Sequence, residues 1–405
     1  MTLPRRSPGK IYLPQGFSFS AARAGIKTSG QLDLGLVEAA SGTSAAAVFT
    51  QNRVVAAPVE IGRTALTASL GRVRAVIVNS GNANCATGNH GYLACRRICN
   101  AVGRVLGVPC GEVFPSSTGI IGVPLPTEKI LVRLSTLVSE QGTTKKHLNQ
   151  FANAILTTDT RPKLASVRFH SRKGIVTLLG VAKGSGMIHP QLATMLVYLF
   201  TDVAATTTEL KRLLRDACGQ TFNRISVDGD TSTNDTVLLL ASGQSGVGLD
   251  NKSTREQFAD ALSKVCQSLA EQIVSDGEGV QHVIRLSVEQ AKNSEEALQV
   301  ARAVSHSLLV KTAWAGADPN WGRILAALGS SGVPINSDKV NIFIGSQLVC
   351  RNGSSCRFDE RTAHQHLVKP VCDVRITLRR GHASTKFLTT DLTADYVRIN
   401  ADYST

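Results

Sequence analysis

Four stretches of the chain place apolar residues three and four positions apart, the spacing of one face of an amphipathic helix. The most regular stretch begins at Phe258, and Ser253-Thr254-Arg255-Glu256 before it is the predicted capping box. Thr206-Thr207-Thr208-Glu209 is predicted to open a second helix in the same way. Two further helices are expected over residues 94–106 and 294–304.

Short runs of β-branched and aliphatic residues lie between these helices. They are bounded by Gly, Asn, Ser or Asp, as strands usually are, and predict strands at residues 45–49, 73–78, 175–179, 195–200, 236–240, 283–287, 340–344 and 374–378. Strands and helices alternate irregularly, which predicts a layered α/β (α+β) fold with helices covering sheets. The most glycine-rich interior stretch, residues 180–190, is expected to be a tight, irregular turn.

Length and composition indicate a folded protein of several domains. The 405 residues are enough for two or three domains, and 42% of them are hydrophobic. The longest apolar runs, such as residues 194–200, are far shorter than the roughly 20 residues that cross a bilayer. We find no signal-peptide pattern at the N-terminus, so we expect a cytoplasmic protein with no membrane partner.

Charge, cysteine and histidine patterns exclude several other classes. The net charge is +14, but the basic residues occur as separated pairs and aromatic residues make up only 5% of the chain, so no nucleic-acid partner is expected. The nine cysteines contain no Cys-x-x-Cys pair, which favours free thiols in a reducing compartment. No pair among the nine histidines has metal-ligand spacing, so no catalytic metal is predicted.

The segment from Lys183 to Thr194 offers the most unusual chemistry. A Thr hydroxyl can attack the preceding carbonyl where the backbone is strained, and hydrolysis of the resulting ester then frees an α-amino group. That amine, with an ordinary pKa of about 7.7–8.0, can serve as base for its own hydroxyl. Residue types alone favour a plain turn before a buried strand. Lys183 is either a solvated surface side chain or a charge that keeps the amine neutral by repulsion.

Two loops, one acidic and one containing Trp321, are interpreted as structural turns rather than as binding sites. Asp228-Gly-Asp230 follows an apolar run, but Thr233 and Leu239 stand where a calcium loop requires Gly and Glu. We interpret this loop as a turn whose side chains hydrogen-bond between domains. Residues 318–323 are interpreted as a tight turn that leads into a helix around residues 324–328.

The segment Lys183-Gly-Ser-Gly-Met-Ile-His-Pro, followed by Ala193-Thr194-Met-Leu, resembles the processing site of the ornithine acetyltransferases, the glutamate N-acetyltransferases of arginine biosynthesis. Further matching blocks follow in order along nearly the whole chain, at residues 49–53, 79–84, 117–122, 157–160, 226–235, 275–279, 316–323 and 399–405. Eight blocks in register are far more specific than any single one.

This resemblance implies a chain that cuts itself between Ala193 and Thr194. An alpha chain of residues 1–193 and a beta chain of residues 194–405 would stay together, typically as two of each, in a fold whose nucleophile is an N-terminal threonine. Thr194 would be that nucleophile. Thr118 and Gly119 match the family's oxyanion-hole pair, and its substrate contacts match Thr157, Lys183, Thr194, Glu278, Asn400 and Thr405.

The implied reaction moves the acetyl group of N2-acetyl-L-ornithine to L-glutamate. No cofactor is needed, because the acetyl group passes from an amide to an ester to an amide; some members of the family also accept acetyl-CoA as donor. The alternative is an N-terminal-nucleophile aminopeptidase or amidase on the same scaffold, in which water resolves the acyl-enzyme. Ping-pong kinetics with little net hydrolysis would distinguish the transferase.

Overall fold

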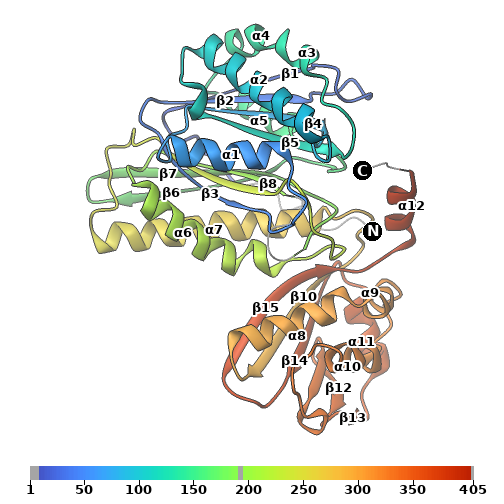
Figure 1. Ribbon diagram of the computed structural model, residues 1–405. Helices are drawn as coiled ribbons and strands as arrows, with labels where there is room; N and C mark the ends of the chain where they lie inside the picture. The colour runs from blue at the N-terminus through green and yellow to red at the C-terminus, as the bar shows by residue number, and fades with distance from the viewer. Residues whose placement is uncertain (1–8, 190–194, 403–405) are drawn as a thin grey trace.

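The computed structural model describes residues 9–189 and 195–402, which form a larger and a smaller lobe (Figure 1). The first sheet of the larger lobe has the order β1-β2-β4-β5, antiparallel except for the parallel pair β4–β5. Its strands are β1 (Phe17–Ala22), β2 (Leu34–Ala39), β4 (Ala75–Asn82) and β5 (Val113–Ile120). Its outer face packs against α2 (Gly88–Leu106), α3 (Thr127–Leu131) and α4 (Leu134–Ser139).

The second sheet is stacked against the first within the same lobe (Figure 1). Its strand order is β3-β9-β8-β7-β6. Its strands are β3 (Ser44–Phe49), β6 (Lys163–Ser171), β7 (Gly174–Lys183), β8 (Leu196–Thr201) and β9 (Thr236–Ala241). Two helices cover its far side, α6 (Thr207–Gln220) and α7 (Lys252–Ser275), while α1 (Ala57–Ala68) and α5 (Lys145–Ala154) contact both sheets. The lobe is thus layered as helix, sheet, sheet, helix.

The central strand β8 is apolar at nearly every position because both of its faces are buried. Tyr198 and Phe200 point into the core between the two sheets, whereas Val197 and Leu199 point into the core formed with α6 and α7. This alternation follows from the two-residue period of side chains along a strand.

The smaller lobe has a sheet and a core of its own. The sheet order is β13-β12-β11-β14-β10-β15, from β10 (Val283–Ala291), β11 (Asn341–Ile344), β12 (Gln347–Arg351), β13 (Ser354–Ser355), β14 (Val371–Thr377) and β15 (Ala383–Thr390). Its helices are α8 (Ser294–His306), α9 (Leu308–Ala315), α10 (Trp321–Gly329) and α11 (Glu360–Leu367). The chain then returns to the larger lobe through α12 (Ala394–Asp402) (Figure 1).

Two local predictions are wrong. The N-cap of α7 is Asn251, whose side chain accepts the Thr254 amide at 2.8 Å, so Ser253 lies inside the helix; the capping box at Thr206 is confirmed. The irregular turn begins at residue 184, because residues 180–183 belong to β7. Gly180 lets β7 pack closely against α7, since a Cβ at this position would lie 2.6 Å from Leu269 Cδ1 of α7.

The predicted cut between residues 193 and 194 does not separate the two lobes. The second sheet contains three strands that precede the cut (β3, β6, β7) and two that follow it (β8, β9), and the later two lie between β3 and β7. None of the helices in residues 9–189 and 195–402 is long and apolar enough to span a membrane.

Candidate active site

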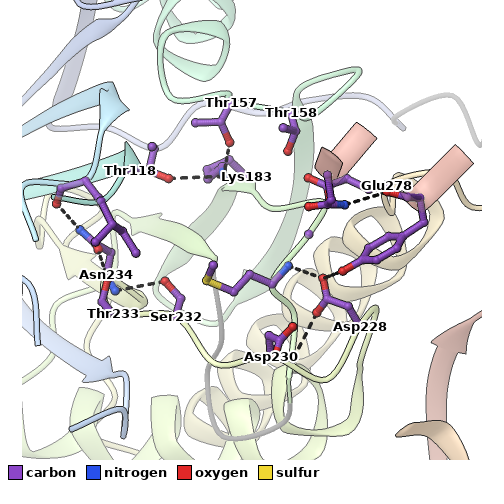
Figure 2. Close-up of a pocket in the computed structure, with 17 residues that line it drawn as sticks. Thr118, Thr157, Thr158, Lys183, Asp228, Asp230, Ser232, Thr233, Asn234 and Glu278 are labelled. Atoms are coloured by element: carbon purple, nitrogen blue, oxygen red, sulfur yellow. Dashed lines mark hydrogen bonds between the residues drawn. The ribbon is translucent and has the colours of Figure 1, made fainter. Parts of the chain in front are cut away.

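A cavity of about 180 Å³ lies at the end of the larger lobe where α12 returns to it (Figure 2). Its lining comes from β5, the end of β7, residues 157–158, the loop 228–234, Glu278 and α12. Six residues that the family resemblance singles out line this one cavity: Thr118, Gly119, Thr157, Lys183, Glu278 and Asn400. Ala193, Thr194 and Thr405 lie outside the described residues, and Met195 is the first described residue after the predicted cut.

Lys183 is the last residue of β7 and carries a buried ammonium group. Its side chain is 2% exposed, which contradicts the solvated-surface interpretation. Its Nζ donates to Thr157 Oγ1 at 2.7 Å and to Thr118 Oγ1 at 3.4 Å, and lies 3.6 Å from Asp159 Oδ2 (Figure 2). An anionic group entering the cavity would therefore meet one cation flanked by two hydroxyls.

Gly119 allows β5 to approach β4 closely beside Thr118. Its φ is +131°, and a Cβ at this position would lie 2.4 Å from the carbonyl carbon of Gly81. No L side chain fits there, because the obstruction is backbone rather than a mobile side chain. The backbone forms a bulge here, at the end of the parallel pair, where the register of β4 shifts between Gly81 and Asn82.

Glu278 and Asn400 meet on the side of the cavity formed by α12. Asn400 Nδ2 donates to Glu278 Oε2 at 2.8 Å, and the Glu278 amide donates to the Ser185 carbonyl at 2.9 Å (Figure 2). The carboxylate lies directly over Gly186, where a Cβ would come within 2.3 Å of Oε2. The glycine-rich turn thereby makes room for the acidic side chain.

Asp228 joins the glycine-rich turn to α12. Its carboxylate accepts the amides of Met187 at 2.5 Å and Ile188 at 2.9 Å, and the hydroxyl of Tyr396 at 3.3 Å. Desolvation raises the pKa of Asp228 to about 6, although these backbone hydrogen bonds oppose the change. The loop that was predicted to hydrogen-bond between domains thus bonds to the glycine-rich turn and to α12, and it lines the cavity.

Asp235, directly before β9, holds Met195, the second residue after the predicted cut. It is 1% exposed, and its Oδ1 accepts the Met195 amide at 2.8 Å. Burial raises the pKa of Asp235 well above its usual value. Asn234 beside it donates to the carbonyls of Ala83 at 2.7 Å and Ser117 at 2.9 Å, which holds the loop against β5.

Charge is divided within the cavity. Lys183 provides a cation on one side, while Glu278, Asp228 and Asp230 provide carboxyl groups on the other. Such a division suits a small molecule that carries both an anionic and a cationic group, as an amino acid does. In the part of the chain that the structure describes, no three His, Cys, Asp or Glu side chains form a group that could hold a metal ion.

The sequence predicts no role for Asp159, Asp235 or Tyr396. Asp159 and Asp235 stand inside blocks that resemble the family, and Tyr396 lies four residues before Asn400. Nearness in sequence to these motif residues is the one feature that could have indicated a role. The contacts of the three residues join distant parts of the chain, which the sequence does not show.

The chain is similar to known proteins of arginine biosynthesis. The arginine biosynthesis bifunctional protein ArgJ of Pseudomonas syringae pv. tomato is 41% identical over 96% of this chain and 96% of its own length. The glutamate N-acetyltransferase of Methanopyrus kandleri is 42% identical over 97% of this chain and 99% of its own length. The crystal structure of arginine biosynthesis bifunctional protein ArgJ from Bacillus halodurans matches 51% of this chain and 98% of that chain, with 40% identity and a TM-score of 0.49.

These names are those of acyltransferases and do not favour the aminopeptidase or amidase alternative. A family model described as the ArgJ family matches residues 18–405, which is nearly the whole chain. With relatives above 40% identity along almost all of its length, the chain belongs to the ArgJ family.

Proposed function

We propose that this protein transfers the acetyl group of N2-acetyl-L-ornithine to L-glutamate, giving L-ornithine and N-acetyl-L-glutamate in arginine biosynthesis. Membership of the ArgJ family and the name of the Methanopyrus relative, glutamate N-acetyltransferase, support this reaction. The observation that carries it is that one cavity holds both Glu278 and the buried cation Lys183, which contacts the hydroxyls of Thr118 and Thr157.

The first half-reaction forms an ester on Thr194. Thr194 Oγ attacks the acetyl carbonyl while the α-amino group of the same residue takes the hydroxyl proton. The Thr118 hydroxyl and the Gly119 amide stabilise the charge on the carbonyl oxygen. The bond between carbonyl carbon and nitrogen breaks, the amine returns the proton to the leaving nitrogen, and ornithine departs.

The second half-reaction reverses these steps with a different amine. The amino group of glutamate attacks the acetyl-threonine ester, the ester bond breaks, and Thr194 regains its proton as N-acetylglutamate leaves. The acetyl group is never oxidised or reduced, so we propose that no cofactor takes part. Acetyl-CoA could supply the same acetyl group in the first step, with its thiol as leaving group.

Lys183 is proposed to bind the carboxylate group that ornithine and glutamate have in common. Thr157 is proposed to donate a hydrogen bond to the same group. Glu278, held by Asn400, would receive an ammonium group. Thr405, near the C-terminus, is proposed as a further substrate contact from its position in the family motif.

Position 194 is supported as the nucleophile by its neighbours in the chain. Leu196 is the strand partner of Lys183 in the β7–β8 pair, and two residues of chain reach at most about 7 Å. We propose that the chain cuts itself between Ala193 and Thr194 into an alpha and a beta chain. Two of each would assemble into a heterotetramer in the cytoplasm.

The decisive experiment compares the wild-type protein with Thr194→Ala. Intact mass and N-terminal sequencing should find a second chain beginning at Thr194 in the wild type, and one uncut chain of 405 residues in the variant. Thr312→Ala, on the exposed face of α9, is the matched control and should be cut normally. An uncut wild-type protein with full activity would refute the mechanism.

A second measurement distinguishes transfer from hydrolysis. With N2-acetylornithine labelled in its acetyl group, label should appear in N-acetylglutamate when glutamate is present, with parallel lines in the double-reciprocal plots. Release of labelled acetate at the same rate with and without glutamate would instead indicate an amidase.

A further inference from the structure

A row of four buried charges runs from the cavity into the protein. Lys183 Nζ lies 3.6 Å from Asp159, Asp159 lies 2.5 Å from Lys163 Nζ, and Lys163 Nζ lies 2.6 Å from Asp276. The four side chains are between 0% and 3% exposed. Only Lys183 lines the cavity, and the function proposed above uses none of the other three.

Asp159 also fixes the backbone on which the cavity is built. Its Oδ1 accepts the Gly184 amide at 2.6 Å, and its Oδ2 accepts the Thr157 amide at 3.1 Å. One carboxylate therefore sets the position of Thr157, the direction of the chain after Lys183, and the charge behind the ammonium group.

Asp276 anchors the other end of the row. It accepts the Thr160 amide at 3.0 Å and the Thr160 hydroxyl, and it lies two residues before Glu278. The pair Lys163–Asp276 thus ties the segment carrying Thr157 to the segment carrying Glu278. It does so across the predicted cut.

Among the charged groups near Lys183, Asp159 is the main counter-charge of the Lys183 ammonium group. Burial alone would raise the pKa of Asp159, but the ammonium groups of Lys163 and Lys183 and the Gly184 amide hold it well below its usual range. Burial raises the pKa of Asp235, which disfavours its charged form. Lys27, after β1, has the same sign as Lys183; burial, with that repulsion, lowers the pKa of Lys27 to about 8.

We propose that Asp159 is a positioning residue for substrate binding. It keeps the ammonium group of Lys183 charged and aims it, together with Thr157, at the substrate carboxylate, while Lys163 and Asp276 hold Asp159 in place. Within the described residues, Asp159 is the one carboxylate within 4.0 Å of Lys183 Nζ. This inference rests on the substrate role proposed for Lys183.

Asp159→Asn keeps the shape of the side chain but removes its charge. We expect KM for both N2-acetylornithine and glutamate to rise about 10- to 100-fold, with a smaller change in kcat. A buried ammonium without a counter-charge gives up its proton at lower pH, so the alkaline limb of the pH profile of kcat/KM should move to lower pH. The assay uses protein that mass spectrometry shows to be cut as fully as the wild type.

Asp276→Asn is the matched control. It weakens the same row at the far end but leaves Asp159 between Lys163 and Lys183, so it should lower stability without moving the alkaline limb. An alkaline limb that moves equally in both variants, or in neither, would overturn the inference.

A double-mutant cycle keeps the test informative if Asp159→Asn alone folds poorly. In Lys183→Met protein, where Lys163 still pairs with both carboxylates, Asp159→Asn should cause no further rise in KM. A further rise, equal to that in the wild-type background, would show a merely structural role. If Lys183→Met itself leaves KM unchanged, the proposed role of Lys183 fails, and this inference with it.

Discussion

Gly186 offers a way to displace Glu278 without removing any charged group. A Cβ at this position would lie 2.3 Å from Glu278 Oε2, 2.4 Å from Cδ and 2.6 Å from Oε1. All three contacts are closer than real Cβ atoms come, so the carboxylate has to move in Gly186→Ala. A displaced carboxylate keeps its 2.8 Å hydrogen bond from Asn400 only if the Asn400 side chain moves with it.

The expected cost follows from the contacts that Glu278 would lose. A hydrogen bond or ion pair to a charged group contributes about 1.5–3 kcal/mol, which corresponds to about a 10- to 150-fold change in an equilibrium constant. We therefore expect KM for N2-acetylornithine to rise about 10- to 100-fold in Gly186→Ala. The free energy of unfolding should change little, because Glu278 is only half-buried and faces the cavity.

The assay is initial-rate kinetics on fully cut protein, at several concentrations of N2-acetylornithine and fixed glutamate. Titration calorimetry with ornithine checks affinity without requiring turnover. Gly219→Ala in α6 is the control, since a Cβ there has no neighbour within 4 Å, and both its KM and its affinity should match the wild type. A wild-type KM for Gly186→Ala would show that the position of the Glu278 carboxylate does not matter for binding.

Three further predictions concern the same region. Thr118→Val removes one proposed oxyanion donor and should lower kcat about 10²- to 10³-fold in steady-state assays; an unchanged kcat would exclude that role. Lys163→Met leaves Asp159 and Asp276 buried without their shared cation. Urea denaturation should therefore show a loss of about 3–5 kcal/mol in the free energy of unfolding. An unchanged free energy of unfolding would show that the row of charges does not stabilise the fold. Asp228 has a folded-state pKa of about 6 against 3.8 for the free side chain, so its stabilising effect is present below pH 4 and is lost as pH rises through 6. The difference in unfolding free energy between wild type and Asp228→Asn should therefore fall by up to about 3 kcal/mol across that window, whereas a flat difference would contradict the raised pKa.

Several of the strands that sequence patterns predicted have both faces buried. β8 and β9 are continuous apolar runs because cores lie above and below them. The pattern does not predict β1, β5 or β15, because Ser, Thr, Pro or Lys interrupt the apolar residues of these strands. Their strand conformation depends on pairing with neighbours that are distant in the sequence, which no local pattern records.

The same limit applies to the site. The family resemblance singled out Thr118, Lys183 and Glu278 because motif blocks carry them, and the structure places all three around one cavity. It could not indicate that Lys183 is buried, nor that Asp159 and Asp276 stand behind it. Those facts depend on contacts such as Lys163 to Asp276, 113 residues apart, which exist only once β6 and α7 have packed together.

The arrangement of the second sheet explains how the chain could be cut near its middle and remain one structure. The cut would fall in the connection between β7 and β8, which are adjacent antiparallel strands paired from Leu178–Thr201 to Lys183–Leu196. β3, from before the cut, pairs along its whole length with β9, from after it. Breaking one peptide bond in the connection removes none of these hydrogen bonds, and the two cores that flank the second sheet contain residues from each side. A threonine freed at that point would begin the chain that continues into the central strand of the sheet, beside the strand that ends at Lys183. The proposed cut thus falls in a connection whose two flanking strands pair with each other, the first ending at the buried cation Lys183, whereas a linker between the lobes would offer no such support.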